Sequence, residues 1–449
     1  MPEAAYYGIQ TLRATENFPI SGIPISQLPI FIQTLAMVKK AAASANYQTD
    51  ALARPKFEVI TAACDEIIQG KLLTEFTVDV LQGGAGTSTN MNLNEVIANR
   101  ALELLGKAKG DYKTLHPNDD VNLSQSTNDV YPTAIRIALL FSYKRLHTEI
   151  GLLANAFADK SLEFAQTVKL ARTQLQDAVP MTLGQEFSAF ATAAREDADR
   201  LEEVAQLFLE INLGGTAVGT GINASSDYSR IVLTELRNIT GLALVRSANL
   251  LEATWDTGAF VSFSGMLKRI AVKLSKIAND LRLLSSGPRG GLGEITLPAV
   301  QPGSSIMPSK VNPVIPEAVN QVCFQIMGND LVVALAAAGG QLQLNAMEPV
   351  IVYNLLTSIQ LLERAIGTLR ERCVIGIQAN PDRCKHFLEQ SVGIATAFNP
   401  LLGYDAASRL AKEALATGKT VRELALASGL AESVVNAVLE RASTPGERD

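Results

Sequence analysis

Histidine and cysteine are scarce in this chain of 449 residues, which contains three histidines and four cysteines. No two histidines lie within helical reach of each other, which argues against a zinc or iron site built on histidine pairs. The cysteines are widely spaced and form no C-x-x-C pair, so we expect buried thiols rather than disulfides or metal ligands. An enzyme of this composition must take most of its acid–base chemistry from other residue types, and we predict no metal site.

A basic surface is also lacking, because 45 acidic residues outnumber 39 lysines and arginines. Nucleic acid and anionic membranes both bind basic faces, so we expect neither nucleic acid nor membrane as a partner. No uninterrupted apolar run approaches ~18 residues, which argues against a transmembrane helix. The N-terminus shows no basic region followed by an apolar stretch. We therefore expect no signal peptide and a cytoplasmic location.

Proline is absent from 133–179 and from 181–287. Proline breaks helix interiors, so these gaps permit very long helices. Apolar residues recur there in alternating steps of three and four, which is typical of a helix-bundle seam, and strand signals are weak. We therefore predict an all-α fold. The two seams are Leu139, Tyr143, Leu146, Ile150, Leu153 and Phe157, and Leu267, Ile270, Leu274, Ile277, Leu281 and Leu284.

Six of the 18 prolines fall within 288–316, a long irregular segment in an otherwise helical chain. Segments of this kind are usually functional or disordered, and the apolar residues here argue against disorder. Asn380-Pro381 then opens a smaller helical unit. We predict three domains: an N-terminal helical domain (1–125), a central long-helix bundle (126–379) that carries the irregular segment, and a small C-terminal helical domain (380–449).

Two polar segments each lie just before a predicted helix. In GGAGTSTNMNLNE (83–95) glycines precede Thr87, and STND (126–129) directly precedes a long apolar helix. A polar loop that leads into a helix N-terminus is a natural site for a carboxylate or phosphate. Ordinary N-capping is the alternative for both segments, although four consecutive small polar residues exceed what one cap needs.

The segment GSSIMPSKVNP (303–313) is the most specific polar motif. Gly303 and the paired serines can turn backbone N–H groups toward an anion, while Lys310 and Asn312 add side-chain donors. A proline-rich linker is the alternative, but a linker does not need these residue types at this spacing. The shorter segment RTQ (172–174) is barely informative by itself.

These motifs together resemble the aspartase/fumarase superfamily, whose members cleave a C–N or C–O bond and release fumarate. The resemblance covers nearly the whole chain, because six blocks match in order. It implies an α-helical homotetramer whose central domains share one helix bundle, with active sites assembled from three subunits. The blocks are YYGIQTLRATENFPI, GGAGTSTNMNLNEV, HPNDDVN with QSTND, RTQLQDAVPMTLGQE, GSSIMPSKVNP and QLQLNAMEPVI.

The resemblance also implies residue roles in an anti elimination across Cα–Cβ of the substrate. Ser304 is the implied base, although a serine hydroxyl is too weak unless backbone N–H groups and Lys310 stabilise its alkoxide. Removal of the Cβ proton creates an aci-carboxylate, which requires preorganised donors. The implied contacts are Thr87, Ser126, Thr127 and Ser305 to the β-carboxylate, Lys310 and Asn312 to the α-carboxylate, and Asn128, Thr173 and Gln174 to the amino group.

Gln174 bears on the leaving group, because fumarases carry histidine at the corresponding position. Hydroxide benefits from protonation as it leaves, whereas ammonium departs as neutral ammonia. Glutamine can hydrogen-bond an amino group but cannot act as a general acid. Gln174 therefore favours L-aspartate as substrate, with fumarate and ammonia as products. A class II fumarase that dehydrates malate, another amino-acid lyase and a non-catalytic helical scaffold are the alternatives.

His116, Asn118 and Asp119 match a fumarase segment that forms a second carboxylate site near the entrance. A helix-entry role for this segment is an equally weighted alternative. The resemblance implies no required cofactor, and it suggests activation by a divalent cation, as in some aspartases.

Overall fold

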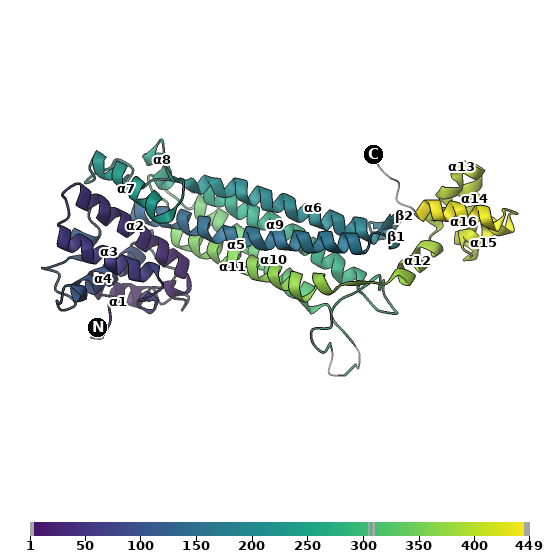
Figure 1. The fold of residues 1–449 in the computed structure, drawn as a ribbon, viewed down its shortest axis with the longest axis horizontal. Helices are drawn as coiled ribbons and strands as arrows, with labels where there is room; N and C mark the ends of the chain where they lie inside the picture. Colours follow the sequence, from purple (N-terminus) through teal and green to yellow (C-terminus); the bar gives the residue numbers. More distant parts are fainter. Residues whose placement is uncertain (1–3, 304–305, 308–309, 444–449) are drawn as a thin grey trace. The chain divides into compact units, whose positions relative to one another are not determined.

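The computed structural model describes residues 4–303, 306–307 and 310–443, and helices dominate this part of the chain (Figure 1). The all-α prediction is confirmed. The helices are α1 (Ile9–Asn17), α2 (Pro29–Gln48), α3 (Arg54–Ile68), α4 (Thr87–Leu104), α5 (Thr127–Glu163), α6 (Leu183–Ala205), α7 (Ser226–Thr240), α8 (Leu250–Trp255), α9 (Gly258–Leu284), α10 (Val314–Ala338), α11 (Glu348–Arg372), α12 (Pro381–Gln390), α13 (Asn399–Leu402), α14 (Tyr404–Thr417), α15 (Val421–Ala427) and α16 (Glu432–Ser443).

The few strands form two-stranded sheets. The antiparallel hairpin β1–β2 is the longest, while β3–β4 is parallel and β5–β6 antiparallel. The strands are β1 (Val168–Thr173), β2 (Gln176–Thr182), β3 (Glu210–Ile211), β4 (Val245–Arg246), β5 (Ile295–Thr296) and β6 (Gln378–Ala379).

The chain divides into two compact units. Unit 1 comprises Met1–His147, Asp199–Ala271 and Phe324–Glu363, and unit 2 comprises Thr148–Ala198, Val272–Cys323 and Arg364–Asp449. The helices α5, α6, α9, α10 and α11 each contribute residues to both units. The three-domain division stays a prediction.

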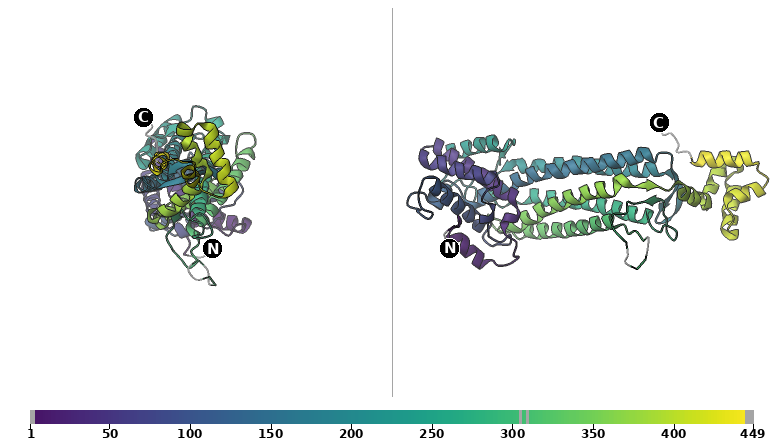
Figure 2. Two further views of the ribbon diagram at one scale, coloured as in Figure 1. Left: turned by 90° about the vertical axis from the view of Figure 1, so that its right-hand side faces the viewer. Right: turned by 60° about the horizontal axis from the view of Figure 1, so that its bottom comes forward.

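Unit 1 contains the N-terminal helices, and α2 lies at their centre against α3, α4 and α7. Figure 2 shows α1–α4, purple to blue, gathered near the N-terminus. Helix α2 begins at Pro29, a residue suited to a first helical turn, and it continues through an alanine-rich stretch that favours helix. Hydrogen bonds also join the long helices here, from Ser264 of α9 to Asp330 and from Asn329 of α10 to Ser358.

Unit 2 contains the other segments of the long helices and the C-terminal helices. Asn320 of α10 donates to Ser275 of α9, and Lys273 of α9 pairs with Asp197 of α6. The C-terminal helices enclose a second apolar core that includes Phe398. All residues of the two predicted seams are buried, and all four cysteines are free and buried, as predicted.

Helix α10 is long and apolar enough to cross a membrane, by length and composition alone. The core helix of a soluble protein passes the same test, so this is weak evidence for a membrane span. The sequence expectation rested on uninterrupted apolar runs, and polar residues such as Asn320 and Asn329 interrupt α10. Only 28 % of its most apolar window is buried, so α10 carries an exposed apolar surface.

Candidate active site

Thr87 begins α4 directly after a turn in which Gly84, Ala85 and Gly86 all have positive φ. A side chain at Gly86 would collide with the ring of Tyr131, so the turn requires glycine at this point. The exposed Thr87 hydroxyl donates to the Gly84 carbonyl at 2.7 Å. Rotation of this hydroxyl can redirect its proton toward a bound carboxylate.

The segment STND does act as a helix cap, but only in part. The Ser126 hydroxyl accepts from the backbone N–H of Asn128 at 3.2 Å, and Asp129 accepts from the backbone N–H of Ser126 at 3.0 Å. The second Asp129 oxygen accepts from the backbone N–H groups of Gly214 and Thr216. Burial raises the pKa of Asp129 to about 6. Capping thus accounts for the side chains of Ser126 and Asp129. It does not account for those of Thr127 and Asn128, which lie between them.

Asn128 is held by a defect in α5. Pro132 has no N–H, so the Asn128 carbonyl loses its donor within the helix, and Asn212 Nδ2 donates to it instead at 3.0 Å. Asn128 Nδ2 in turn donates to the Ala217 carbonyl at 2.7 Å. The amide oxygen of Asn128 then remains as an acceptor, which is the group that an ammonium requires.

His116 takes the helix-entry role that was the alternative for its segment. The backbone N–H groups of Asn118 and Asp119 both donate to His116 Nδ1 at 3.2 Å, at the start of a π-helical turn, Pro117–Val121. His116 Nδ1 also lies 3.4 Å from an Asp119 carboxylate oxygen. A carboxylate site on this segment stays a prediction.

In unit 2, Thr173 and Gln174 lie at the tip of the β1–β2 hairpin. Thr173 pairs with Gln176, so Gln174 and Leu175 form a two-residue turn with φ of 54° and 63°. Side chains other than glycine at such angles cost about 1–3 kcal/mol each, a strain that often marks functional sites. The strained turn leaves both predicted substrate residues exposed.

Strand β1 of this hairpin is held by a buried ion cluster. Glu294 is fully buried and contacts Arg172 Nη1 at 2.6 Å and Lys169 Nζ at 2.8 Å. Lys169 also contacts Glu186 at 2.6 Å. Glu294 lies within the irregular segment 288–316, ahead of the serine pair, and its carbonyl accepts from the backbone N–H of Asn380 at 2.9 Å. The cluster therefore joins the hairpin to the start of the segment that leads to the serine pair.

The two ends of the segment 303–312 are held together. Asn312 Nδ2 donates to the Gly303 carbonyl at 2.7 Å, and any side chain at Gly303 would collide with the backbone of Lys310. The Lys310 side chain is exposed. The predicted base Ser304 and its neighbour Ser305 lie outside the described residues.

The predicted site residues thus form two groups. The group in unit 1 is Thr87, His116, Asn118, Asp119, Ser126, Thr127 and Asn128, and the group in unit 2 is Thr173, Gln174, Lys310 and Asn312.

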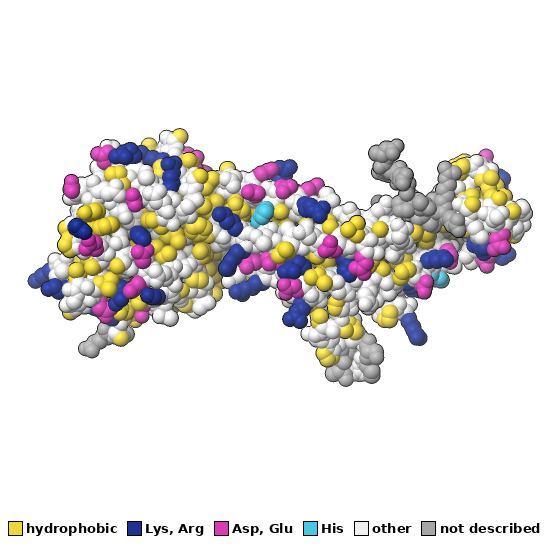
Figure 3. All heavy atoms as spheres, viewed as in Figure 1, with side chains coloured by type: hydrophobic (Ala, Val, Ile, Leu, Met, Phe, Trp, Pro, Cys, Tyr) yellow, Lys and Arg dark blue, Asp and Glu magenta, His cyan; other side chains and the backbone are white. Residues whose placement is uncertain are grey.

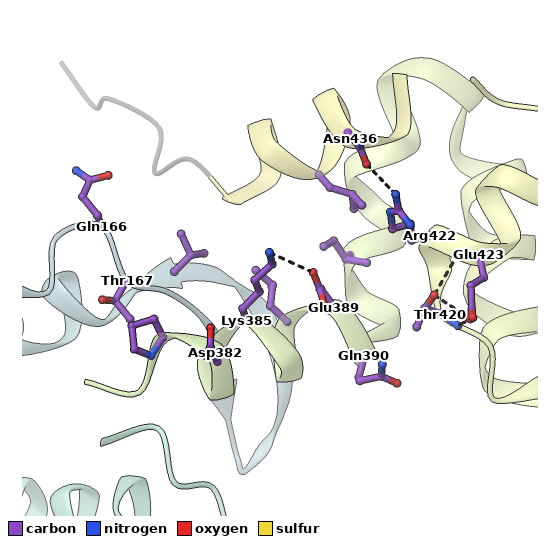
Figure 4. Close-up of a pocket in the computed structure, with 15 residues that line it drawn as sticks. Gln166, Thr167, Asp382, Lys385, Glu389, Gln390, Thr420, Arg422, Glu423 and Asn436 are labelled. Carbon is purple, nitrogen blue, oxygen red and sulfur yellow. Dashed lines mark hydrogen bonds and ion pairs between the residues drawn. The ribbon is translucent and has the colours of Figure 1, made fainter. Parts of the chain in front are cut away.

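A cavity of about 770 Å³ in unit 2 contains none of these residues (Figure 4). Several of its charged groups already have partners, because Arg422 pairs with Glu432 and donates to Asn436, and Lys385 pairs with Glu389. This cavity therefore offers no feature that selects a ligand.

A family model described as lyase matches residues 1–328, and one described as fumarase C C-terminus matches residues 394–441. The chain belongs to the aspartase/fumarase family. Proteins named aspartate ammonia-lyase are 59 % identical in Pseudomonas canavaninivorans and 52 % in Escherichia coli. The alignments cover 97 % and 96 % of this chain and 92 % and 90 % of those proteins.

Two solved structures extend the family likeness to the fold. A fumarate lyase:delta crystallin from Brucella melitensis, solved bound to cobalt, has a TM-score of 0.97 and 62 % identity, covering 99 % of this chain and 97 % of that one. A class II fumarase from Schistosoma mansoni has a TM-score of 0.93 and 34 % identity, covering 99 % and 96 %.

The predicted site list missed a buried polar group beside Thr127, formed by Lys39, Asn90 and Asn122. A signal was available for Lys39, because it lies in the apolar stretch AMVKKAAASA (36–45). Lysine is almost never fully buried unless it has a partner, so an apolar position occupied by lysine points to a special environment.

Proposed function

We propose that this member of the aspartase/fumarase family catalyses the reversible anti elimination of ammonia from L-aspartate, giving fumarate. The observation that carries the proposal is the set of relatives, 52–60 % identical over nearly the whole chain, that share the name aspartate ammonia-lyase. Gln174 agrees with it, because the described hairpin presents an amide, and not a general acid, at its tip.

The proposed chemistry divides between base and donors. Ser304 removes the Cβ proton, and Thr87, Ser126, Thr127 and Ser305 stabilise the aci-carboxylate that forms. Lys310 and Asn312 hold the α-carboxylate. The free amide oxygen of Asn128, together with Thr173 and Gln174, orients the ammonium for departure as ammonia. The bonds broken are Cβ–H and Cα–N, and the Cα–Cβ double bond of fumarate forms.

We also propose that the chain assembles as a homotetramer with sites shared between three subunits. The support is the exposed face of α10, where Phe324, Leu331 and Leu335 are 60 %, 61 % and 65 % exposed. Figure 3 shows hydrophobic side chains in patches on the face of the molecule that it draws. Apolar surface of this kind gains free energy when a second copy covers it. Light scattering should report four times 48.0 kDa, and a fully active monomer would contradict the assembly.

A cytoplasmic location and activation by a divalent cation, which is not a required cofactor, are proposals too. Free buried thiols suit the reducing conditions of a cytoplasm. Among the described residues, no group of three or more His, Cys, Asp or Glu side chains could hold a metal ion. The cobalt-bound relative nevertheless motivates a test of a divalent cation as activator, by comparing rates after chelator treatment and after Mg²⁺ addition.

The deciding experiment follows fumarate absorbance with L-aspartate and, separately, with L-malate. We expect rapid deamination and slow dehydration; faster dehydration of malate would favour the fumarase alternative. Ser304→Ala should then lower kcat by several orders of magnitude while aspartate still binds. Lys310→Ala is the matched control, because loss of a carboxylate partner should mainly raise KM.

A further inference from the structure

A chain of hydrogen bonds crosses the interior of unit 1 behind Thr127. Lys39 Nζ donates to Asn122 Oδ1 at 2.7 Å. Asn90 Nδ2 donates to the same oxygen at 3.1 Å and to Thr127 Oγ1 at 3.1 Å. Lys39 and Asn90 are 0 % and 2 % exposed. The chain therefore connects a buried ammonium to one of the predicted substrate donors.

In this row of hydrogen bonds, each group takes only one role, donor or acceptor. Lys39 Nζ donates to Asn122, so Asn122 turns its oxygen toward Lys39. The Asn122 amide nitrogen then faces the Gln125 carbonyl at 3.3 Å, which can only accept. Because Asn122 presents an oxygen, Asn90 must present its NH₂ group to Asn122 and to Thr127. Lys39 thus sets the orientation of both amides.

The orientation of the Asn90 amide determines whether the Thr127 hydroxyl donates or accepts a hydrogen bond at the substrate. Its oxygen accepts from Asn90, so its own proton is not needed inside the protein and is left for another acceptor. A threonine whose proton pointed inward would present lone pairs to a carboxylate, which would repel it. The hydrogen-bond chain makes Thr127 the correct kind of group for a developing dianion.

We infer that Lys39, Asn122 and Asn90 are positioning residues that hold the Thr127 hydroxyl as a hydrogen-bond donor to the substrate carboxylate. This inference rests on the proposed function. A fixed donor requires no reorganisation during the reaction, which is the main advantage of a preorganised site. The buried charge of Lys39 also polarises the two amides in the direction of donation.

The environment of Lys39 supports a role beyond packing. Desolvation by burial lowers the pKa of Lys39 to about 7, and the charged or titratable groups that act on it are Asp129 of α5 and Cys64 of α3. Asp129 already accepts from three backbone N–H groups. A buried lysine whose direct partner is a neutral amide loses its hydration without a counter-charge in contact, so stability does not explain its presence.

The decisive variant is Asn90→Asp, which keeps the shape of the side chain but replaces the donor to Thr127 by an acceptor. A carboxylate only accepts, so the Thr127 proton turns inward and the substrate loses a donor. We expect kcat for aspartate to fall about a hundredfold, the usual loss for one such donor. Asn92→Asp is the matched control: Asn92 is equally buried on α4 and donates to the Glu75 carbonyl at 3.0 Å, and not to Asn122 or Thr127. It should change kcat by less than about tenfold.

The second step asks whether Asn90 acts through Thr127. In a Thr127→Val background, which has no hydroxyl to orient, Asn90→Asp should cause almost no further loss of kcat. A full additional loss in that background would overturn the inference. Should Asn90→Asp fail to fold, Asn90→Ala takes its place: the hydroxyl becomes free to rotate, and the smaller loss should again vanish with Thr127→Val.

Lys39→Met separates positioning from structural support. We expect kcat to fall about tenfold while urea unfolding shows no loss of stability, because an unpaired buried charge has been removed. Parallel losses of activity and stability would assign Lys39 a structural role and contradict the inference. The proposed function fails separately, if the wild-type protein forms no fumarate from L-aspartate.

Discussion

Lys39 in unit 1 and Lys169 in unit 2 are both almost completely buried, with 0 % and 3 % of their surface exposed. Lys39 contacts a neutral amide, and desolvation lowers its pKa to about 7. Lys169 also loses solvation, but it lies between Glu186 and Glu294, whose attraction outweighs that loss and raises its pKa. Burial alone therefore does not determine whether the pKa of a lysine is raised or lowered; the neighbouring charges determine it.

The two environments serve different purposes. In unit 2 the charges compensate one another and join the hairpin to the start of the serine segment. In unit 1 the amino group of Lys39 donates to a neutral amide, and Asp129 acts on it without a hydrogen bond. Removing one partner from a buried ion pair leaves an unpaired charge, whereas removing an unpaired charge ends a desolvation cost. The same kind of substitution should thus have opposite effects on stability in the two units.

The largest effect should come from Glu294→Gln, because it leaves Lys169 and Arg172 buried without their shared carboxylate. We expect the free energy of unfolding in urea to fall by about 3–5 kcal/mol. Glu186→Gln is the control, since the Glu186 side chain is 22 % exposed and solvent can compensate part of its loss. Equal losses in both variants would show that burial of Glu294 is not what matters.

A matched pair of substitutions tests the comparison directly. Lys169→Met should lower the free energy of unfolding by about 3 kcal/mol, because Glu186 and Glu294 lose a buried partner. Lys39→Met should leave it unchanged or raise it. Both proteins would be measured under one set of urea conditions. A large loss from Lys39→Met would mean that its bond to Asn122 fully compensates the burial.

The pH dependence of stability should also distinguish Lys39. Its pKa is about 7 in the folded protein, against 10.5 for an ordinary solvated lysine, so between these values the unfolded chain binds more protons. The destabilisation is then complete below pH 7 and is relieved as pH rises, by up to about 1.4 kcal/mol per pH unit. Urea unfolding of wild type and Lys39→Met at pH 7 and pH 8 measures the difference. Parallel pH profiles would contradict the lowered pKa.

The smallest effect concerns the strained turn of unit 2. Leu175→Gly should relieve about 1–2 kcal/mol of left-handed strain and cost about 0.4–1 kcal/mol through a more flexible unfolded chain. Leu175 is 71 % exposed, so little packing is lost. Ala85→Gly is the comparison in unit 1, where a buried methyl group would be lost. Thermal unfolding should show a small gain for Leu175→Gly only.

Features that depend on periodicity were predictable from the sequence. The seams from Leu139 to Phe157 and from Leu267 to Leu284 are buried, because spacing alone determines which side of a helix faces its neighbours. The cap at Ser126 followed from small polar residues before an apolar run, whereas α4 begins at Thr87, inside the polar segment 83–95 that was expected to precede it.

Features that depend on contacts distant in sequence were not predictable in this way. Lys39 meets Asn122 across 83 positions and Arg172 meets Glu294 across 122, and no local pattern connects them. The sequence analysis also missed the exposed apolar face of α10. It searched for uninterrupted apolar runs, and polar residues such as Asn320 and Asn329 interrupt the sequence of this helix. Pairings of this kind are set by the fold.

The defect in α5 has a consequence for synthesis on the ribosome. The Asn128 carbonyl that Pro132 leaves without a donor is satisfied by Asn212, which follows 84 positions later. At about 5–20 residues per second, roughly 4 to 17 seconds pass between translation of the two residues. During that interval the growing chain must keep the first turns of α5 hydrated or held by a chaperone. The region can close only after Asn212 has left the ribosome.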